Sequence, residues 1–223
     1  MITKDSKIIL LACGTYNPLT IGHLRMMESA KDNIERMTCG KVIHGFLSPV
    51  SDSYKKKGMI PSEHRIEMLR LGVKNSDWLK IHTWEAERDC WSRTIEVVNR
   101  IKEEYNHINN LIVSLVMGGD VLDSFQVIKD DGEPLWDRND IEYFASNGLI
   151  CQVRPNSNVE ETIKKLNLEK YVNNNLYTFT DVICPNDISS TKVRYGLKNN
   201  ISVKYAIPDD VLNYIMENKL YQE

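Results

Sequence analysis

The chain has 223 residues, of which 42% are hydrophobic and 26% charged, so it excludes a disordered protein and leaves room for a buried core. Its formal net charge of −3 argues against a wholesale nucleic-acid binder, which would carry a basic surplus. The five cysteines are scattered with neither CxxC nor a zinc spacing, so we expect no disulfide framework, no structural metal and a reducing compartment.

Apolar runs of strand length alternate with amphipathic segments along the chain. The expected strands are residues 7–13, 41–48, 78–84, 111–119 and 148–153, and the expected helices are 24–37, 61–75, 88–105, 138–145, 189–198 and 208–218. Strands that alternate with helices favour βαβ units. With right-handed crossovers they predict an α/β fold: a Rossmann-like, doubly wound parallel sheet with helices on both faces, in one domain of residues 1–223.

Two details of this pattern can be compared with the structure. In the helix expected at 88–105, Trp91, Ile95, Val98 and Ile101 are spaced for one face. The asparagine-rich stretches 106–110 and 173–175 are expected to be loops.

The stretch GTYNPLTIGH, residues 14–23, follows the first expected strand and precedes a helix. Ligands of such folds gather at the carboxyl ends of the strands. Gly14 allows close backbone approach, and His23 falls near a helix start, where free N–H groups favour an anion. We expect this loop to be exposed and to contact phosphate, although an ordinary turn would use the same residues. Neither GxxxxGK[ST] nor GxGxxG is present, which excludes two familiar phosphate loops.

Two further stretches carry hydroxyl or basic side chains. In NDISSTKVRYGLKN, residues 186–199, Asp187 or Ser189 could cap a helix whose start, with Arg194, forms a second anion site. The alternative is a capping motif with a basic exposed face. The run YKKKG, residues 54–58, is either a solvated loop or a phosphate contact.

Together these motifs resemble a known family. Residues 20–23, TIGH, resemble the TxGH signature of the nucleotidyltransferase superfamily, and ISSTKVR, residues 188–194, resembles the ISSTxxR motif of adenylyltransferases. Stretches 48–65, 77–85, 118–125, 134–141 and 148–154 are similar to nicotinamide-nucleotide adenylyltransferase of the eukaryotic type. The resemblance runs from about residue 7 to about 218, which is also the expected core of the domain. The departures are small: Thr20, Tyr16 and Gly119 replace more frequent residues.

The resemblance implies adenylyl transfer from ATP to nicotinamide mononucleotide, and also to nicotinic acid mononucleotide, giving the dinucleotide and pyrophosphate. The mononucleotide phosphate would attack the α-phosphorus in line, so positioning and charge neutralisation suffice and no protein nucleophile is needed. Mg²⁺ would act as cofactor through the triphosphate and water, and no residue is expected to bind metal directly.

The resemblance also implies roles for individual residues. His23 and Arg194 would be the catalytic groups at the ATP phosphates. The further ATP-binding residues would be Gly14, Thr15, Thr20, Asp120, Ser189, Ser190 and Thr191. The mononucleotide-binding residues would be Tyr16, Asn17, Lys56, Thr83, Trp84, Trp136 and Arg154. Lys55 and Lys57 stay open as alternatives to Lys56.

Trp84, Trp136 and Asp120 could each have a structural role in place of the binding role that the resemblance implies. Trp84 and Trp136 would flank the cationic pyridine ring, a contact of ~0.5–2 kcal/mol, although tryptophan more often packs in a core. Asp120 would accept hydrogen bonds from a ribose, cap a helix, or do both.

The alternatives at the level of function are an adenylyltransferase for another small phosphate, such as phosphopantetheine, and a second, chaperone-like role. We expect no nucleic-acid partner and no membrane span, because no run reaches the ~18 apolar residues of a spanning helix. A homo-oligomer stays open. We expect the protein to be located in the cytoplasm, with the nucleus as a second location.

Overall fold

The computed structural model describes residues 2–155 and 157–222, and its centre is a six-stranded sheet. The strands are β1 (Lys7–Gly14), β2 (Lys41–Pro49), β3 (Leu79–Ile81), β4 (Leu111–Gly118), β5 (Leu149–Gln152) and β6 (Leu176–Phe179). Their order is β3-β2-β1-β4-β5-β6, and every neighbouring pair is parallel. The chain runs outward in both directions from the β1–β4 pair, which makes this pair the topological switch point where such folds bind ligands.

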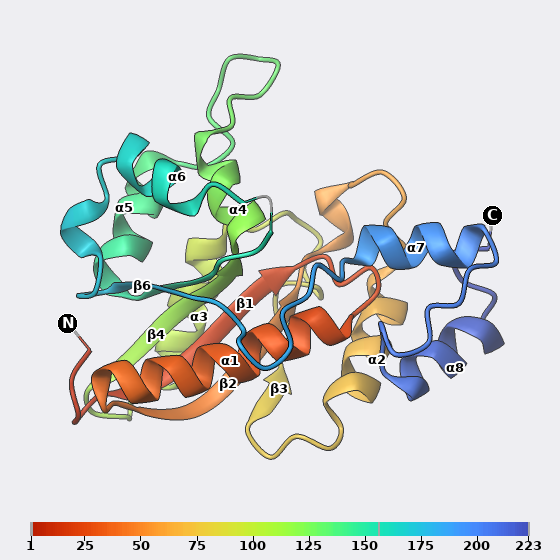
Figure 1. Ribbon diagram of the computed structural model, residues 1–223, viewed down its shortest axis with the longest axis horizontal. Helices are drawn as coiled ribbons and strands as arrows, with labels where there is room; N and C mark the ends of the chain where they lie inside the picture. The colour runs from red at the N-terminus through yellow and green to blue at the C-terminus, as the bar shows by residue number, and fades with distance from the viewer. Residues whose placement is uncertain (1, 156, 223) are drawn as a thin grey trace.

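Helices cover both faces of this sheet, as expected from the sequence. They are α1 (Ile21–Thr38), α2 (Ser62–Val73), α3 (Thr94–Glu104), α4 (Gly119–Asp123), α5 (Arg138–Asn147), α6 (Val159–Lys165), α7 (Ser190–Lys198) and α8 (Asp209–Glu217). Figure 1 shows α1 in front of the sheet, and α7 and α8 together at one end of the molecule. The Rossmann-like α/β prediction is therefore confirmed.

The residues of β1 alternate between two cores. Ile9 and Leu11 belong to the core under α3 and α5, whereas Ile8 and Leu10 belong to the core under α1. Successive side chains of a strand point to opposite faces, so a strand covered on both sides must be apolar at every position. This explains why the run KIILLAC is continuous rather than alternating.

Two predicted elements are shorter than expected. The strand at 78–84 pairs only over β3, and the helix at 88–105 begins at Thr94. The cause of the late helix start is a cap: the Glu96 carboxylate accepts the backbone N–H of Arg93 at 3.0 Å. Trp91 thus precedes the helix and is 53% exposed, so its expected place on one face of this helix with Ile95, Val98 and Ile101 is wrong.

Three elements were not expected from the sequence, namely the five-residue α4, the seven-residue α6 and the four-residue β6. They are too short to show a period of their own. Burial stabilises β6 instead, since Leu176 and Phe179 pack into the two cores. The loops expected at 106–110 and 173–175 are present.

A third core joins the C-terminal helices to α2. Its buried members include Met68 of α2, Val193 of α7, and Val211 and Ile215 of α8. This packing fixes the start of α7 next to the loop that follows β1, as the hydrogen bonds below show. Among the described helices, none has the length and apolar character needed to cross a bilayer.

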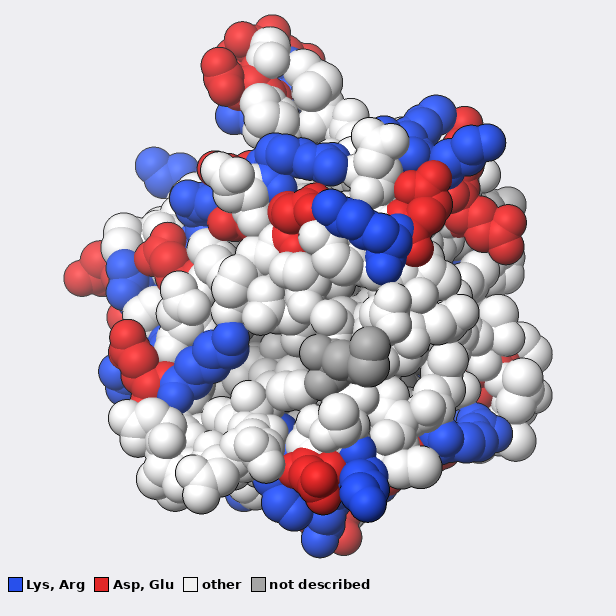
Figure 2. All heavy atoms as spheres, turned by 90° about the vertical axis from the view of Figure 1, so that its left-hand side faces the viewer, with Lys and Arg blue, Asp and Glu red and all other residues white. Residues whose placement is uncertain are grey.

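One segment stands away from the body of the molecule. Residues 127–135 form a hairpin, closed by hydrogen bonds from Leu135 N–H to Val127 O at 2.9 Å and from Lys129 N–H to Glu133 O at 2.8 Å. Figure 1 shows it projecting beyond α4, and Figure 2 shows acidic side chains at its tip. On the face drawn in Figure 2, basic and acidic side chains are interspersed, without the basic stripe of a nucleic-acid site.

Candidate functional site

The loop after β1 lies at the carboxyl edge of the sheet, beside the ends of β2 and β4. The expectation that it is exposed is wrong, because residues 16–20 are all buried. The Tyr16 hydroxyl donates to Ala12 O at 2.7 Å, and the Asn17 amide donates to Gly58 O at 2.8 Å. The side chains of Tyr16 and Asn17 are thus engaged inside the protein. These side chains are therefore not available for the mononucleotide contacts expected of them.

His23 sits in the first turn of α1 and is held there by Thr20. The backbone N–H of Thr20 donates to His23 Nδ1 at 3.1 Å, and the Thr20 hydroxyl lies 2.9 Å from the same nitrogen. The His23 backbone N–H in turn donates to Thr20 Oγ1 at 3.4 Å, which completes a capping box. Because Nδ1 accepts the Thr20 N–H, the proton of the neutral ring is on Nε2. His23 therefore offers an N–H donor.

The charge state of His23 follows from its surroundings. Burial of the imidazole, together with the positive charge of Arg154, lowers the pKa of His23 to about 4. At neutral pH the ring is uncharged and donates a hydrogen bond rather than forming an ion pair. Thr20 is fully buried, so the direct contact with ATP expected for it does not fit the structure. Its role is to orient His23.

Gly22 explains the third position of the TIGH motif. A Cβ atom built there would lie 2.9 Å from Ile188 O and 3.2 Å from Asn186 Oδ1. Only glycine lets the start of α1 approach the segment before α7 so closely. The two sequence motifs are therefore in backbone contact in the folded chain.

Helix α7 is docked onto the loop after β1 by its own motif residues. Ser189 is the N-cap, its hydroxyl accepting the Lys192 N–H at 3.3 Å, so Ser189 rather than Asp187 caps the helix. The Ser190 hydroxyl donates to Pro18 O at 2.7 Å, and Arg194 donates to Asn17 O at 2.7 Å. Thr191, in the same first turn, is exposed. The motif thus presents a helix N-terminus, a suitable place for a phosphate, while its side chains brace the loop.

Arg65 was not among the site residues expected from the sequence, and it is fully buried. Its guanidinium donates to Thr15 O at 3.0 Å, Val50 O at 2.8 Å and Ile60 O at 3.0 Å, and pairs with Asp52 at 2.8 Å. Arg65 thereby joins the loop after β1 to the loop after β2. Its place in the stretch PSEHR, within a motif already noted, was the available signal.

Trp84, expected to hold the pyridine ring, has limited access. Its ring packs against the α3-side core, and the Arg88 guanidinium lies over it at 4.5 Å. Trp91, not among the expected site residues, is 53% exposed. In the sequence, the helical spacing of Trp91 with Ile95 and Ile101 does not indicate this exposure.

Trp136 lies close to the Trp91 segment. Its indole N–H donates to Ser124 Oγ at 3.0 Å, and its ring lies 4.8 Å from that of Phe125. Arg93 pairs with Asp137 at 3.2 Å, so the chain next to Trp91 is tied to the chain next to Trp136. This ion pair joins the segment that contains Trp91 to the segment that contains Trp136.

Asp120 and Arg154 meet at the carboxyl ends of β4 and β5. The Asp120 carboxylate is largely exposed and 3.9 Å from the Arg154 guanidinium. The N-cap of α4 is Gly118 and not Asp120, so the capping alternative is wrong. A Cβ on Gly118 would lie 2.6 Å from Asp120 Oδ1 and 3.0 Å from Arg154 Nε, which explains the first glycine of GGD. The positive charge of Arg154 also acts on His23, where it helps to lower the pKa of the imidazole.

Lys56 is exposed in a turn where its backbone carbonyl accepts the Met59 N–H at 3.1 Å. Neither Lys56 nor its neighbours Lys55 and Lys57 form an ion pair within the described residues. Gly14, Thr15 and Thr83 are partly exposed. Gly14 ends β1, and Thr83 opens the turn that carries Trp84.

Glu85 is a buried carboxyl group between the ends of β1 and β2. It accepts the Ser48 hydroxyl at 3.0 Å and is 3% exposed. Burial raises the pKa of Glu85 to about 7, against the opposing effects of the Ser48 hydrogen bond and the Arg65 charge. Burial likewise raises the pKa of Cys13, whose neighbour is the same carboxyl. These two groups sit under the site and do not provide a nucleophile.

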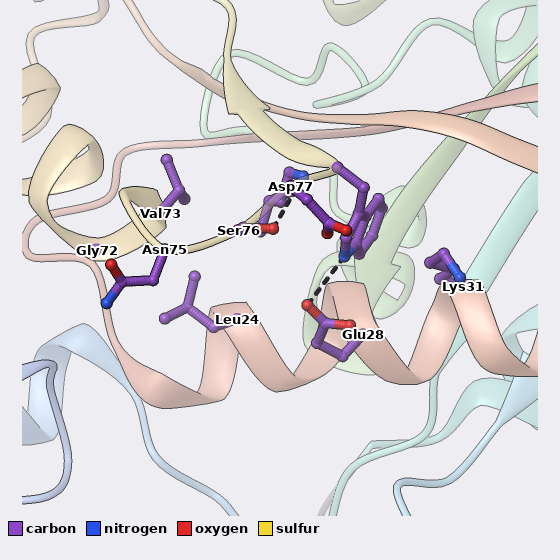
Figure 3. A pocket seen from close by; sticks show the side chains of 10 residues that line it. Leu24, Glu28, Lys31, Gly72, Val73, Asn75, Ser76 and Asp77 are labelled. Carbon is purple, nitrogen blue, oxygen red and sulfur yellow. Dashed lines mark hydrogen bonds between the residues drawn. The ribbon is translucent and has the colours of Figure 1, made fainter.

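A cavity of about 510 Å³ lies apart from this edge, near the start of β3. Figure 3 shows Leu24, Glu28 and Lys31 of α1 facing Val73 and Asp77 across it. Glu28 already accepts the Trp78 indole N–H at 3.0 Å. Within residues 2–155 and 157–222, no three His, Cys, Asp or Glu side chains are grouped to hold a metal ion.

Comparison with known proteins identifies the family. The family described as cytidylyltransferase-like matches residues 11–196. Nicotinamide/nicotinic acid mononucleotide adenylyltransferase 2 of Caenorhabditis elegans is 40% identical, over 97% of this chain and 99% of its own. The bovine (Bos taurus) nicotinamide/nicotinic acid mononucleotide adenylyltransferase 1 is 32% identical, over 98% of this chain and 90% of its own.

A solved structure agrees in fold. The nicotinic acid mononucleotide adenylyltransferase of Plasmodium falciparum, in complex with NaAD, superposes with a TM-score of 0.68 at 19% identity, over 96% of this chain and 97% of that one. The chain therefore belongs to the cytidylyltransferase-like nucleotidyltransferases and, among them, to the nicotinamide/nicotinic acid mononucleotide adenylyltransferases.

Proposed function

We propose that this chain transfers the adenylyl group of ATP to nicotinamide mononucleotide and to nicotinic acid mononucleotide. The observation that carries the proposal is the joining of the TIGH and ISST motifs at the switch point of the sheet, where Ser190 donates to Pro18 O and Gly22 meets Ile188 O. Two helix N-termini, those of α1 and α7, then converge on one place. Each favours the negative charge of a phosphate.

The reaction needs a positioned triphosphate and a positioned acceptor. The mononucleotide phosphate attacks the α-phosphorus, a new P–O bond forms to the acceptor oxygen, and the bond to the β-phosphate oxygen breaks as pyrophosphate leaves. His23 would donate its Nε2 proton in a hydrogen bond to a phosphate oxygen. The helix start at Ser189–Thr191 and the Arg154 guanidinium would offset the developing charge.

Arg194, unlike His23, already donates side-chain hydrogen bonds to groups of the α7–loop contact. One of its amino groups already donates to Asn17 O at 2.7 Å, and another lies 3.4 Å from Thr191 Oγ1. It would therefore both hold the loop and face the triphosphate. The Asp120 carboxylate, mostly exposed, is free to accept hydrogen bonds from the ribose of ATP.

We propose Mg²⁺ as part of the substrate, bound to the triphosphate. Mg²⁺ keeps several waters and binds readily through phosphate oxygens, so it requires few protein ligands. The acidic side chains at this edge of the sheet include Asp120, which is exposed, and Glu85, which is buried, and that role would require neither of them as a direct ligand.

The mononucleotide would lie between the lysine run and the tryptophans. Lys56, exposed and without an ion pair in the described chain, would take its phosphate. Trp91 and Trp136 come from segments joined by the Arg93–Asp137 pair, and they would hold the pyridine ring. Thr83 and the backbone of Tyr16 and Asn17 would complete the acceptor side.

A panel of acceptors tests the proposal. The purified chain, supplied with ATP and Mg²⁺, is given nicotinamide mononucleotide, nicotinic acid mononucleotide or phosphopantetheine, and the products are separated by chromatography. We expect dinucleotide from both mononucleotides and none from phosphopantetheine. Product from phosphopantetheine alone would assign the other adenylyltransferase activity instead.

A further inference from the structure

A second pocket lies between the 58–60 loop, α7 and the C-terminal residues 219–222. Its volume is about 630 Å³, within the size range of small-molecule sites. It is lined by Gly58, Met59, Ile60, Thr191, Arg194, Tyr195, Lys198, Lys219, Leu220, Tyr221 and Gln222. Figure 1 shows the C-terminal end of the chain next to α7. Residues 219–222 of that end line the pocket opposite α7.

The charges of this pocket are of one sign. Arg194, Lys198 and Lys219 line it, and no aspartate or glutamate is among its described lining residues. None of the three cations forms an ion pair with a described carboxylate. In contrast, Lys192 and Lys204, on either side along the chain, pair with Asp187 and Asp209. Lys198 and Lys219 are therefore left for an external anion, whereas Arg194 already donates to Asn17 O.

The walls of the pocket converge on one buried residue. The Tyr221 hydroxyl donates to Asn17 Oδ1 at 2.7 Å, the Asn17 amide donates to Gly58 O at 2.8 Å, and Arg194 donates to Asn17 O at 2.7 Å. Each wall thus has a hydrogen bond to Asn17, which is 3% exposed. Because these hydrogen bonds already order the walls of the pocket, little of a ligand's binding free energy would be spent on ordering the protein.

We propose that this pocket is a second anion site, which binds a small polyphosphate while the ATP site is occupied. Charge-assisted hydrogen bonds from Lys198 and Lys219 would hold the anion, with Arg194 on the side that faces the ATP site. The proposal rests on the proposed function in one respect: pyrophosphate, the polyanion that the reaction releases, leaves next to Arg194. Lys198 and Lys219 belong to this pocket and not to the proposed catalytic groups.

The test uses a dead-end complex, so that pyrophosphate cannot occupy the ATP site. The full chain is saturated with Mg²⁺, a mononucleotide and an ATP analogue whose α,β-bridge is methylene, and is titrated with inorganic pyrophosphate by calorimetry. We expect one further binding event. The double variant Lys198→Gln/Lys219→Gln should weaken it at least tenfold. The matched control Lys7→Gln/Lys41→Gln removes the same charge at the amino ends of β1 and β2 and should change it less than twofold.

Two results would overturn the proposal: no binding to the dead-end complex, or equal affinity in wild type and the Lys198→Gln/Lys219→Gln variant. A chain that fails to bind the ATP analogue would refute the proposed function instead. In that case the same pyrophosphate titration is made on the free protein and on both double variants. It still shows whether pyrophosphate binds in the pocket through Lys198 and Lys219. Both pairs of lysines are exposed, so circular dichroism should show folded protein in every variant.

Discussion

The surroundings of His23 disfavour the protonated imidazolium, so the ring is a neutral hydrogen-bond donor. The Thr20 N–H occupies Nδ1, and burial with Arg154 lowers the pKa of His23 to about 4. A charged imidazole would face an arginine in a poorly solvated place. A neutral one can donate through Nε2 at any physiological pH, which suits a group that contacts phosphate without transferring a proton.

The two candidate tryptophans can be separated by substitution. Trp91→Ala should raise the KM for the mononucleotide about tenfold and leave the KM for ATP within twofold, because an exposed aromatic contact is worth ~0.5–2 kcal/mol. Trp84→Ala should lower stability more than affinity, since Trp84 packs against the core and under Arg88. Steady-state kinetics and thermal unfolding of both variants measure the difference. The opposite pattern would return the ring contact to Trp84.

Glu85 should make the stability of the protein depend on pH. Its pKa is about 7 in the folded chain and about 4.5 when unfolded, so the folded state holds an extra proton between these values. Stability is therefore lost as pH rises from 4.5 through 7. Glu85→Gln keeps an acceptor for Ser48 and removes the charge, so the variant should gain about 2–3 kcal/mol relative to wild type between pH 5 and pH 8. Urea unfolding at both pH values measures it. Glu87→Gln, at an exposed position, is the control, and a Glu85→Gln variant that follows wild type would contradict the raised pKa.

Among the secondary-structure elements, the site is formed where the N-termini of α1 and α7 lie next to each other. The start of α1 carries His23, and that of α7 carries Ser189–Thr191. Gly22 and the Ser190–Pro18 hydrogen bond fix their distance. Arg65 holds the loop after β1 from below, through Thr15 O and Val50 O. Backbone contacts between these elements thus position the protein groups that we propose to bind phosphate. The side-chain motifs of the sequence alone do not reveal these contacts.

Gly22→Ala tests that contact. Alanine gains at most about 1 kcal/mol of helix propensity, whereas forcing a methyl group 2.9 Å from Ile188 O costs about 1–3 kcal/mol. We expect a net loss of stability of about 1 kcal/mol and a loss of activity larger than stability explains, because α1 and α7 move apart. Arg36→Ala, in the last turn of α1, controls for changes within the helix. Full activity in a folded Gly22→Ala protein would show that the spacing is unimportant.

At the scale of the whole molecule, one sheet links nearly all of the chain. Strands from residue 7 to residue 179 pair in a single order, and α7 and α8 share a core with α2. We therefore expect one cooperative unfolding transition, with calorimetric and van't Hoff enthalpies that agree. Two resolved transitions in a scanning calorimeter would contradict the single domain expected over residues 1–223.

Much of this architecture could be predicted, because long apolar runs and helical periods are local signals. KIILLAC and LIVSLVMGG are strands on any reading, and both lie at the centre of the sheet. The strand β6 and the start of α3 could not, since β6 is stabilised by burial and α3 is delimited by the Glu96 cap. The same holds for the site. His23 and Arg194 stand in motifs, but the burial of Thr20, the bracing by Arg65 and the exposure of Trp91 are products of packing.

If the loop after β1 forms the phosphate site of an adenylyltransferase, removal of the His23 imidazole should slow the reaction. The rate of dinucleotide formation by wild type and His23→Ala is measured at saturating ATP, Mg²⁺ and mononucleotide, with circular dichroism to confirm the fold. Loss of one positioned donor typically costs about 10²–10³ in turnover, and we predict a fall of that size. A folded His23→Ala protein with turnover within threefold of wild type would show that His23 does not contact the reacting phosphates.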